Sequence, residues 1–211
     1  MWSKHFSFKV NALVILIGVH QLFYCDFAKA EKSEFAIAVD LVKQKNYIEA
    51  YKLFAKLSEF NDHDAQFNAA LLLKKGLGHP TNYKLALKWI SLADLGGLKR
   101  AADIRQEVLS LVPLETAAEV HAEIKEILQT RLDSGDVSVC LQFAKFYLEI
   151  IDEPDYKTAY ALRSVATALN VPGASKLRNQ IQNELEAADL IESQALAAKL
   201  FNETRWQLDD D

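Results

Sequence analysis

Apolar residues recur along most of this chain with the spacing of an amphipathic α-helix. The stripe is clearest between positions 82 and 95, where it consists of Leu85, Ala86, Trp89, Ile90 and Ala93. These positions share one face of a helix. Asn82 is a favoured N-cap at its start, and Gly96 is a favoured residue just after its end. No segment alternates apolar and polar residues convincingly, so the pattern predicts helices and no strands.

Glycine and proline divide the chain into segments of helical length. There are only seven Gly and four Pro in 211 residues, too few for the frequent turns of an all-β fold. The predicted helices span 33–45, 47–59, 63–75, 82–95, 98–111, 115–133, 136–149, 154–169, 173–184 and 187–205. Short connections favour antiparallel neighbours.

Two offsets relate parts of the chain to one another. At an offset of 36 residues, the segment 46–50 (NYIEA) matches 82–86 (NYKLA). At an offset of 73 residues, the matches pair Tyr83 with Tyr156, Ala86 with Ala159, Ser91 with Ser164, Ala101 with Ala174 and Arg105 with Arg178. Such periods in helical sequence are typical of stacked arrays, because one helix pair cannot bury its apolar face alone. We therefore expect an all-α fold, an α-solenoid of antiparallel helix pairs rather than a closed bundle.

The segment 64–97 (DAQFNAALLLKKGLGHPTNYKLALKWISLADLGG) resembles the Sel-1-like repeat (SLR), a relative of the tetratricopeptide repeat. The matching positions are Ala65, Ala70, Leu73, Gly76, Gly78, Ala86, Trp89, Ala93 and Gly96. Ala70 stands where the family usually has Gly, and Leu73 where it has Tyr. Gly76 and Gly78 permit positive φ in the loop between the two helices, and Trp89 is expected to fill the space between them.

Weaker units flank this best repeat, which we place at about 63–98. Residues 33–62 and 136–171 resemble degenerate units, and 105–128 and 178–201 resemble the non-repeat helices of exported bacterial members. The resemblance implies a right-handed superhelix of the tetratricopeptide and Sel-1-like kind with extra non-repeat helices. It also implies a module for protein–protein interaction.

The first thirty residues have the layout of a secretory signal peptide. A basic start at Lys4 and Lys9 precedes an apolar run from 13 to 19, and 28–30 (AKA) forms a small-x-small cleavage site. The run is far shorter than the ~20 residues that span a bilayer, and an uncleaved anchor is the alternative. We expect cleavage after Ala30, which leaves one solenoid domain at 31–211 in the periplasm or outside the cell.

Charge and cysteine content narrow the classes of partner. The net charge is −5, and loss of residues 1–30, which hold three Lys and one Asp, makes it −7. An acidic chain without a basic cluster is a poor candidate for binding nucleic acid or anionic membrane. Cleavage also removes Cys25, so Cys140 has no partner for an internal disulfide. Its apolar neighbours favour a buried thiol.

The sequence contains no motif of a hydrolase, a nucleotide site or a thiol–disulfide enzyme. The histidines after position 30 lack the spacing of metal ligands and are expected to be ordinary surface residues: His63, His79 and His121. Glu119, Glu123 and Glu126 are separated by four and three residues, so they lie on one face of a helix. We expect this face to be solvated, and we do not expect the carboxylates to be catalytic. We therefore expect no catalytic, cofactor-binding or metal-binding residue.

In solenoids of this type the first helix of each pair lines the concave groove. Helical spacing then gives the candidate partner-binding residues Phe67, Leu71, Lys74, Leu141, Lys145 and Leu148. The alternative is that the apolar members, such as Phe67 and Leu141, are simply packed in the core.

The functional hypothesis is an exported interaction scaffold or adaptor that binds a protein or peptide in this groove, in envelope signalling or complex assembly. One alternative is β-lactamase-like or other hydrolase activity, known in cysteine-rich relatives whose paired cysteines this chain lacks. Another is a structural role at the cell wall. The sequence leaves the partner and the oligomeric state open.

Overall fold

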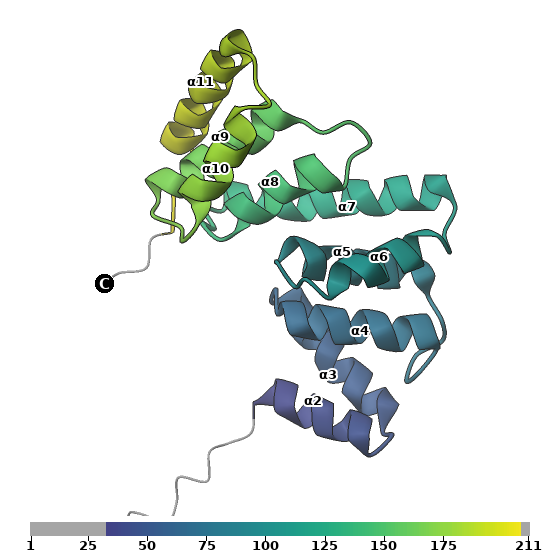
Figure 1. Ribbon diagram of the computed structural model, residues 1–211. Helices are drawn as coiled ribbons and strands as arrows, with labels where there is room; N and C mark the ends of the chain where they lie inside the picture. The colour runs from purple at the N-terminus through teal and green to yellow at the C-terminus, as the bar shows by residue number, and fades with distance from the viewer. Residues whose placement is uncertain (1–32, 208–211) are drawn as a thin grey trace, which may run out of the picture.

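The computed structural model describes residues 33–207, and within them it contains ten α-helices and no strand (Figure 1). The helices are α2 (Glu34–Lys43), α3 (Tyr47–Glu59), α4 (His63–Lys75), α5 (Tyr83–Leu95), α6 (Ala101–Leu109), α7 (Leu114–Asp133), α8 (Val139–Glu149), α9 (Tyr156–Ala168), α10 (Ala174–Gln182) and α11 (Ala187–Glu203). All ten predicted helices are present, and no predicted boundary differs from the observed one by more than three residues.

Consecutive helices pack against one another along the chain. The pairs α2–α3, α4–α5 and α8–α9 are in close contact, and α4, α6 and α10 each pack on the helix that precedes them. The longer helix α7 lies on α5 and α8, and α11 lies on α9. Figure 1 shows a stack that runs from α2 at one end to α11 at the other. The predicted all-α solenoid of stacked helix pairs is confirmed.

Polar N-cap side chains hold the starts of α4, α5 and α9. Asp62, Asn82 and Asp155 each accept a 2.9 Å hydrogen bond from the backbone N–H three residues later. These bonds satisfy donors that have no partner inside the helix. The N-cap predicted at Asn82 is therefore confirmed.

Glycines shape the loop between α4 and α5, as the repeat pattern predicted. Gly76 and Gly78 have φ of 66° and 74°. A Cβ atom on Gly78 would lie 2.1 Å from the carbonyl oxygen of Tyr47, so this loop packs tightly against the start of α3. The prediction at the end of α5 was wrong by one residue: Gly96 has φ of −69°, and the left-handed residue is Gly97 at 90°.

The offset of 73 residues corresponds to a repeat of four helices. Helices α9, α10 and α11 begin 73 residues after α5, α6 and α7. We call α4–α7 the first block and α8–α11 the second block. Trp89 of the first block is 4% exposed, as predicted for a residue between helices, and Leu162 at the equivalent place in the second block is 1% exposed.

The predicted signal peptide at residues 1–30 lies outside the described residues. No helix in the described part is both long enough and apolar enough to cross a membrane. The division into a leader and one domain at 31–211 stays a prediction.

Candidate partner-binding surface

The six candidate groove residues lie on the first helix of each block. Helix α4 carries Phe67, Leu71 and Lys74, and α8 carries the set Leu141, Lys145 and Leu148. All six side chains are half-buried, so they are neither core residues nor fully solvated. Their neighbours show how much of each side chain is open to a partner.

The candidate residues of α4 lie beside α6 and the turn before it. The guanidinium of Arg100 stacks 4.5 Å from the ring centre of Phe67, and Arg100 also pairs with Asp64. The ammonium of Lys74 lies 2.5 Å from the carboxylate of Glu107 on α6. Phe67 and Lys74 therefore already interact with other residues of their own chain. Only part of each side chain is left for contact with another molecule.

Lys145 belongs to a buried ion cluster that joins α8 to the first block. Its ammonium donates to the side-chain oxygen of Asp94 at 2.7 Å and to the backbone oxygen of Asp94 at 2.8 Å. The Asp94 carboxylate is 1% exposed and also accepts a 2.7 Å bond from Arg105. A carboxylate buried this deeply requires such partners. The sequence signal was an acidic residue among the apolar positions of α5, and our reading of the chain missed it.

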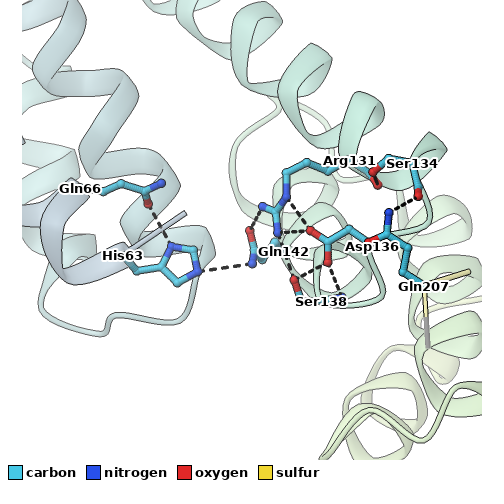
Figure 2. A network of polar contacts seen from close by, with 8 residues as sticks. All are labelled: His63, Gln66, Arg131, Ser134, Asp136, Ser138, Gln142 and Gln207. Carbon is cyan, nitrogen blue, oxygen red and sulfur yellow. Dashed lines mark hydrogen bonds and ion pairs between the residues drawn. The ribbon is translucent and has the colours of Figure 1, made fainter. Parts of the chain in front are cut away.

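A chain of polar contacts links α4 to α8 (Figure 2). Arg131, near the end of α7, donates to the side-chain oxygen of Gln142 at 2.9 Å. The amide nitrogen of Gln142 lies 3.4 Å from Nε2 of His63, whose Nδ1 lies 3.0 Å from the side-chain oxygen of Gln66. The chain ends at Ser58, whose backbone oxygen accepts from Gln66 at 3.1 Å.

The directions of these bonds indicate the tautomer of the imidazole. Gln66 donates to a carbonyl through its nitrogen, so its oxygen accepts from Nδ1–H of His63. The Nε2 atom of His63 is then the acceptor for the amide of Gln142. His63 therefore connects the two blocks, and it is half-buried rather than fully solvated.

Figure 2 also shows how the loop before α8 is held. The carboxylate of Asp136 pairs with Arg131 at 2.7 Å and accepts from the backbone and side chain of Ser138 at 2.9 and 2.6 Å. The backbone oxygen of Gly135 accepts from the backbone N–H of Gln207 at 2.8 Å. The segment after α11 thus returns to the junction between the blocks.

A cavity of about 460 Å³ adjoins this link, because Arg131 lines it as well. Glu59 at the end of α3 forms one wall, and Glu123, Glu126 and Ile127 of α7 form the other. Asp136 neutralises the charge of Arg131, so the glutamate side chains that line the cavity make it acidic. Part of the face of α7 that was predicted to be solvated forms ion pairs instead. Glu119 and Glu123 lie 2.7 and 3.5 Å from the ammonium of Lys84.

A second cavity, of about 600 Å³, lies between the α6–α7 turn and the loop after α8. Arg105 and His121 line it together with apolar residues such as Ile150. Burial, and next the positive charge of Arg105, lower the pKa of His121, while Asp152 opposes the shift. His121 is half-buried, so it too differs from a fully solvated histidine.

Cys140 is fully buried at the start of α8, as predicted. Burial raises the pKa of its thiol to about 12, so the sulfur stays protonated. A protonated, inaccessible thiol is a poor nucleophile. Among the described residues, no three His, Cys, Asp or Glu side chains are grouped as ligands of a metal ion.

No protein-family model matches the chain, and no curated protein matches it. A search of solved structures finds similarity to a crystal structure described as a protective antigen of uropathogenic Escherichia coli strains displaying an SLR fold. The match has a TM-score of 0.37 and 16% sequence identity, and it covers 81% of this chain. The chain spans only 45% of that protein. Within the described residues, this chain has the paired-helix solenoid architecture that its resemblance to Sel-1-like repeats implies.

Proposed function

We propose that the protein is a non-catalytic interaction scaffold that holds a partner protein or peptide between the end of α3 and helix α7. The observation that carries this proposal is the cavity of about 460 Å³ lined by Glu59 and by residues of α7, one of which, Arg131, also binds Gln142 of α8. Stacked helix repeats support the proposal, because they present extended concave surfaces for binding.

The chemistry of the cavity favours a partner segment that carries Lys or Arg. Glu59, Glu123 and Glu126 line it, and its single arginine is already paired with Asp136. Complementary charge steers association and fixes the register of a bound segment. Ile127 supplies an apolar wall for the stem of a long basic side chain.

The half-exposed apolar residues of the first helices extend the proposed surface. They are Phe67, Leu71, Leu141 and Leu148. Lys74 and Lys145 take part mainly through their own chain, because their ammonium groups bind Glu107 and Asp94. Substitution of either lysine is therefore expected to change the packing of the groove, and not only to remove one contact with the partner.

Photocrosslinking tests this proposal in the native cell. A photoreactive residue at Leu71, Leu148 or Glu126 is expected to capture one common partner, identified by mass spectrometry. The control position is Lys176, an exposed residue of α10. The same capture from Lys176 would contradict the proposed surface.

Charge reversal then tests the acidic cavity. The double variant Glu123→Lys and Glu126→Lys is expected to reduce capture of that partner. The matched control is Glu184→Lys with Glu203→Lys, which changes the charge equally at exposed positions outside the cavity. Equal capture by both double variants would overturn the proposed role of the carboxylates.

Export to the periplasm or the exterior is part of the proposal and rests on the layout of residues 1–30. The mature protein is expected to begin at Glu31 in an envelope or medium fraction. N-terminal sequencing checks this.

A labelled β-lactam tests the hydrolase alternative in the same preparation. It is expected to leave the protein unmodified, and covalent labelling would favour the hydrolase alternative instead.

A further inference from the structure

The two blocks differ in whether a further helix covers the surface formed by their second and fourth helices. In the first block, the surface formed by α5 and α7 receives helix α8. Three contacts define this covered face: Lys145 binds Asp94, Gln142 binds Arg131, and the ring centre of Tyr147 lies 5.6 Å from the ammonium of Lys125. On the two helices that receive α8, Leu95 of α5 is 3% exposed and Leu128 of α7 is 0% exposed.

The equivalent surface of the second block is formed by α9 and α11, and no helix of the described chain covers it. We call it the terminal face, defined by the residues that line a cavity of about 230 Å³: Ser164, Val165, Ala168, Ala197, Ala198, Phe201 and Asn202. Phe201 takes the place of Leu128 and is 40% exposed, and Ala168 takes the place of Leu95 and is exposed.

The polar anchors of the covered face are replaced on the terminal face. Thr167 stands at the place of Asp94 and donates to the backbone of its own helix at Arg163. Ala198 stands at the place of Lys125. The hydroxyl of Ser164 is buried and has no hydrogen-bond partner among the described residues. The terminal face therefore suits an apolar contact better than a contact through a lysine, such as the one that Lys145 of α8 makes with Asp94.

Helix α2 lies at the opposite end of the stack (Figure 1), and seven of its ten residues are apolar. It is the first helix of its pair, as α8 is. Its apolar residues other than Ala38 keep some exposed surface: Phe35, Ala36, Ile37, Val39, Leu41 and Val42. Four of them also pack against the core of their own chain, namely Phe35, Val39, Leu41 and Val42, whereas Ile37 is 40% exposed. A helix that is apolar on most of its circumference is usually covered on more than one side, and α2 packs chiefly on α3.

We propose that the terminal face binds helix α2 of a second copy of this chain, so that copies stack head to tail. The second copy then continues the helix array as α8 continues the first block. The two surfaces are different, so the interface is heterologous and each copy keeps one open end. The proposal is independent of the partner proposed for the acidic cavity.

Sedimentation velocity and light scattering of the full chain test the proposal. The mass of the wild-type protein is expected to rise with concentration. Phe201→Glu on the terminal face and Ile37→Glu on α2 are each expected to weaken association by on the order of tenfold or more, because each buries a charge in an apolar contact. Both side chains are 40% exposed, so both variants are expected to keep the helical content of the wild type.

A mixture of the two variants distinguishes head-to-tail stacking from other interfaces. Phe201→Glu retains a native α2, and Ile37→Glu retains a native terminal face, so the mixture is expected to form a one-to-one dimer that grows no further. The matched control is Leu114→Glu, at an exposed leucine of the first block, which is expected to associate like the wild type. A wild-type protein that stays monomeric overturns the proposal, as do a mixture that stays monomeric, a control variant that fails to associate, and association that survives Ile37→Glu.

Discussion

The last three helices of the first and second blocks begin at equivalent positions, but the blocks differ at the surfaces where the next helix would pack. In the first block Asp94 and Arg105 form a buried ion cluster with Lys145 of the covering helix α8. In the second block Thr167 takes the place of Asp94, and Arg178 bonds to the neighbouring side chain of Asn179 instead. The apolar positions that build each block persist through the repeat, whereas the buried ion cluster occurs only where another helix covers it.

This difference separates two kinds of constraint on a repeat sequence. Positions inside a block must stay apolar and small enough for close packing, which Ala86 and Ala159 show by being fully buried. Positions on the outer face depend on what covers them. A buried carboxylate such as Asp94 is tolerable only with its partners in place, so it is lost where α8 has no counterpart.

The largest expected effect tests whether the two blocks share one core. Trp89→Ala is expected to lower the free energy of unfolding by about 3–5 kcal/mol, because it leaves a cavity between packed helices. Leu162→Ala, at the equivalent place in the second block, is expected to cost about 2–5 kcal/mol. Urea unfolding followed by circular dichroism measures both. Unchanged unfolding of Trp89→Ala would show that the indole is not part of the core.

The second prediction concerns a substitution that gives the covered face of the first block the residue found at the equivalent place in the second block. Asp94→Thr is expected to destabilise the protein by about 3 kcal/mol, because it leaves the buried guanidinium of Arg105 without its carboxylate. The reciprocal change Thr167→Asp lies beside the terminal face, at a half-buried position that no helix of the described chain covers, and is expected to cost within about 0.5 kcal/mol.

A double-mutant cycle with Lys145→Met separates the ion pair from packing. The loss of Lys145 is expected to cost less in the Asp94→Thr background than in the wild type, because its partner is already gone. Additive costs would show that Lys145 and Asp94 do not stabilise each other.

Much of this fold could be predicted from the sequence because the signals were local. The apolar stripe around Trp89 and the N-cap at Asn82 needed only neighbouring residues. The contacts between blocks could not be predicted in this way, since His63 and Gln142 are 79 residues apart in the chain. Lys145 was predicted to lie in the groove, and nothing near it in sequence pointed to Asp94, which lies 51 residues away.

The third prediction concerns the segment that returns from α11 to the start of the second block. Gly135 has φ of 84°, and a Cβ atom there would lie 1.9 Å from the backbone oxygen of Arg205. Gly135→Ala is expected to release this segment, to cost about 1 kcal/mol or more and to speed tryptic cleavage after Arg205. Gly173→Ala is the matched control, because Gly173 has φ of 79° with nothing within 4 Å of a new Cβ. Equal cleavage of the two variants would show that backbone strain, rather than the contact with Arg205, explains the effect.

The smallest expected effect is a pH dependence carried by His121, which lines the cavity beside the ion cluster of the first block. Burial and Arg105 lower the pKa of His121 below its ordinary value of 6.5. The unfolded chain then binds more protons than the folded chain as the pH falls below 6.5, so folding stability decreases in that range. Above 6.5 the imidazole is neutral in both states and its contribution to stability is fully present. The second block has Gln194 at the equivalent place, and His121→Gln is therefore expected to flatten the dependence of the urea midpoint on pH between about 5 and 7. An equally steep dependence in this variant would assign the titration to other groups and remove His121 from the difference between the blocks.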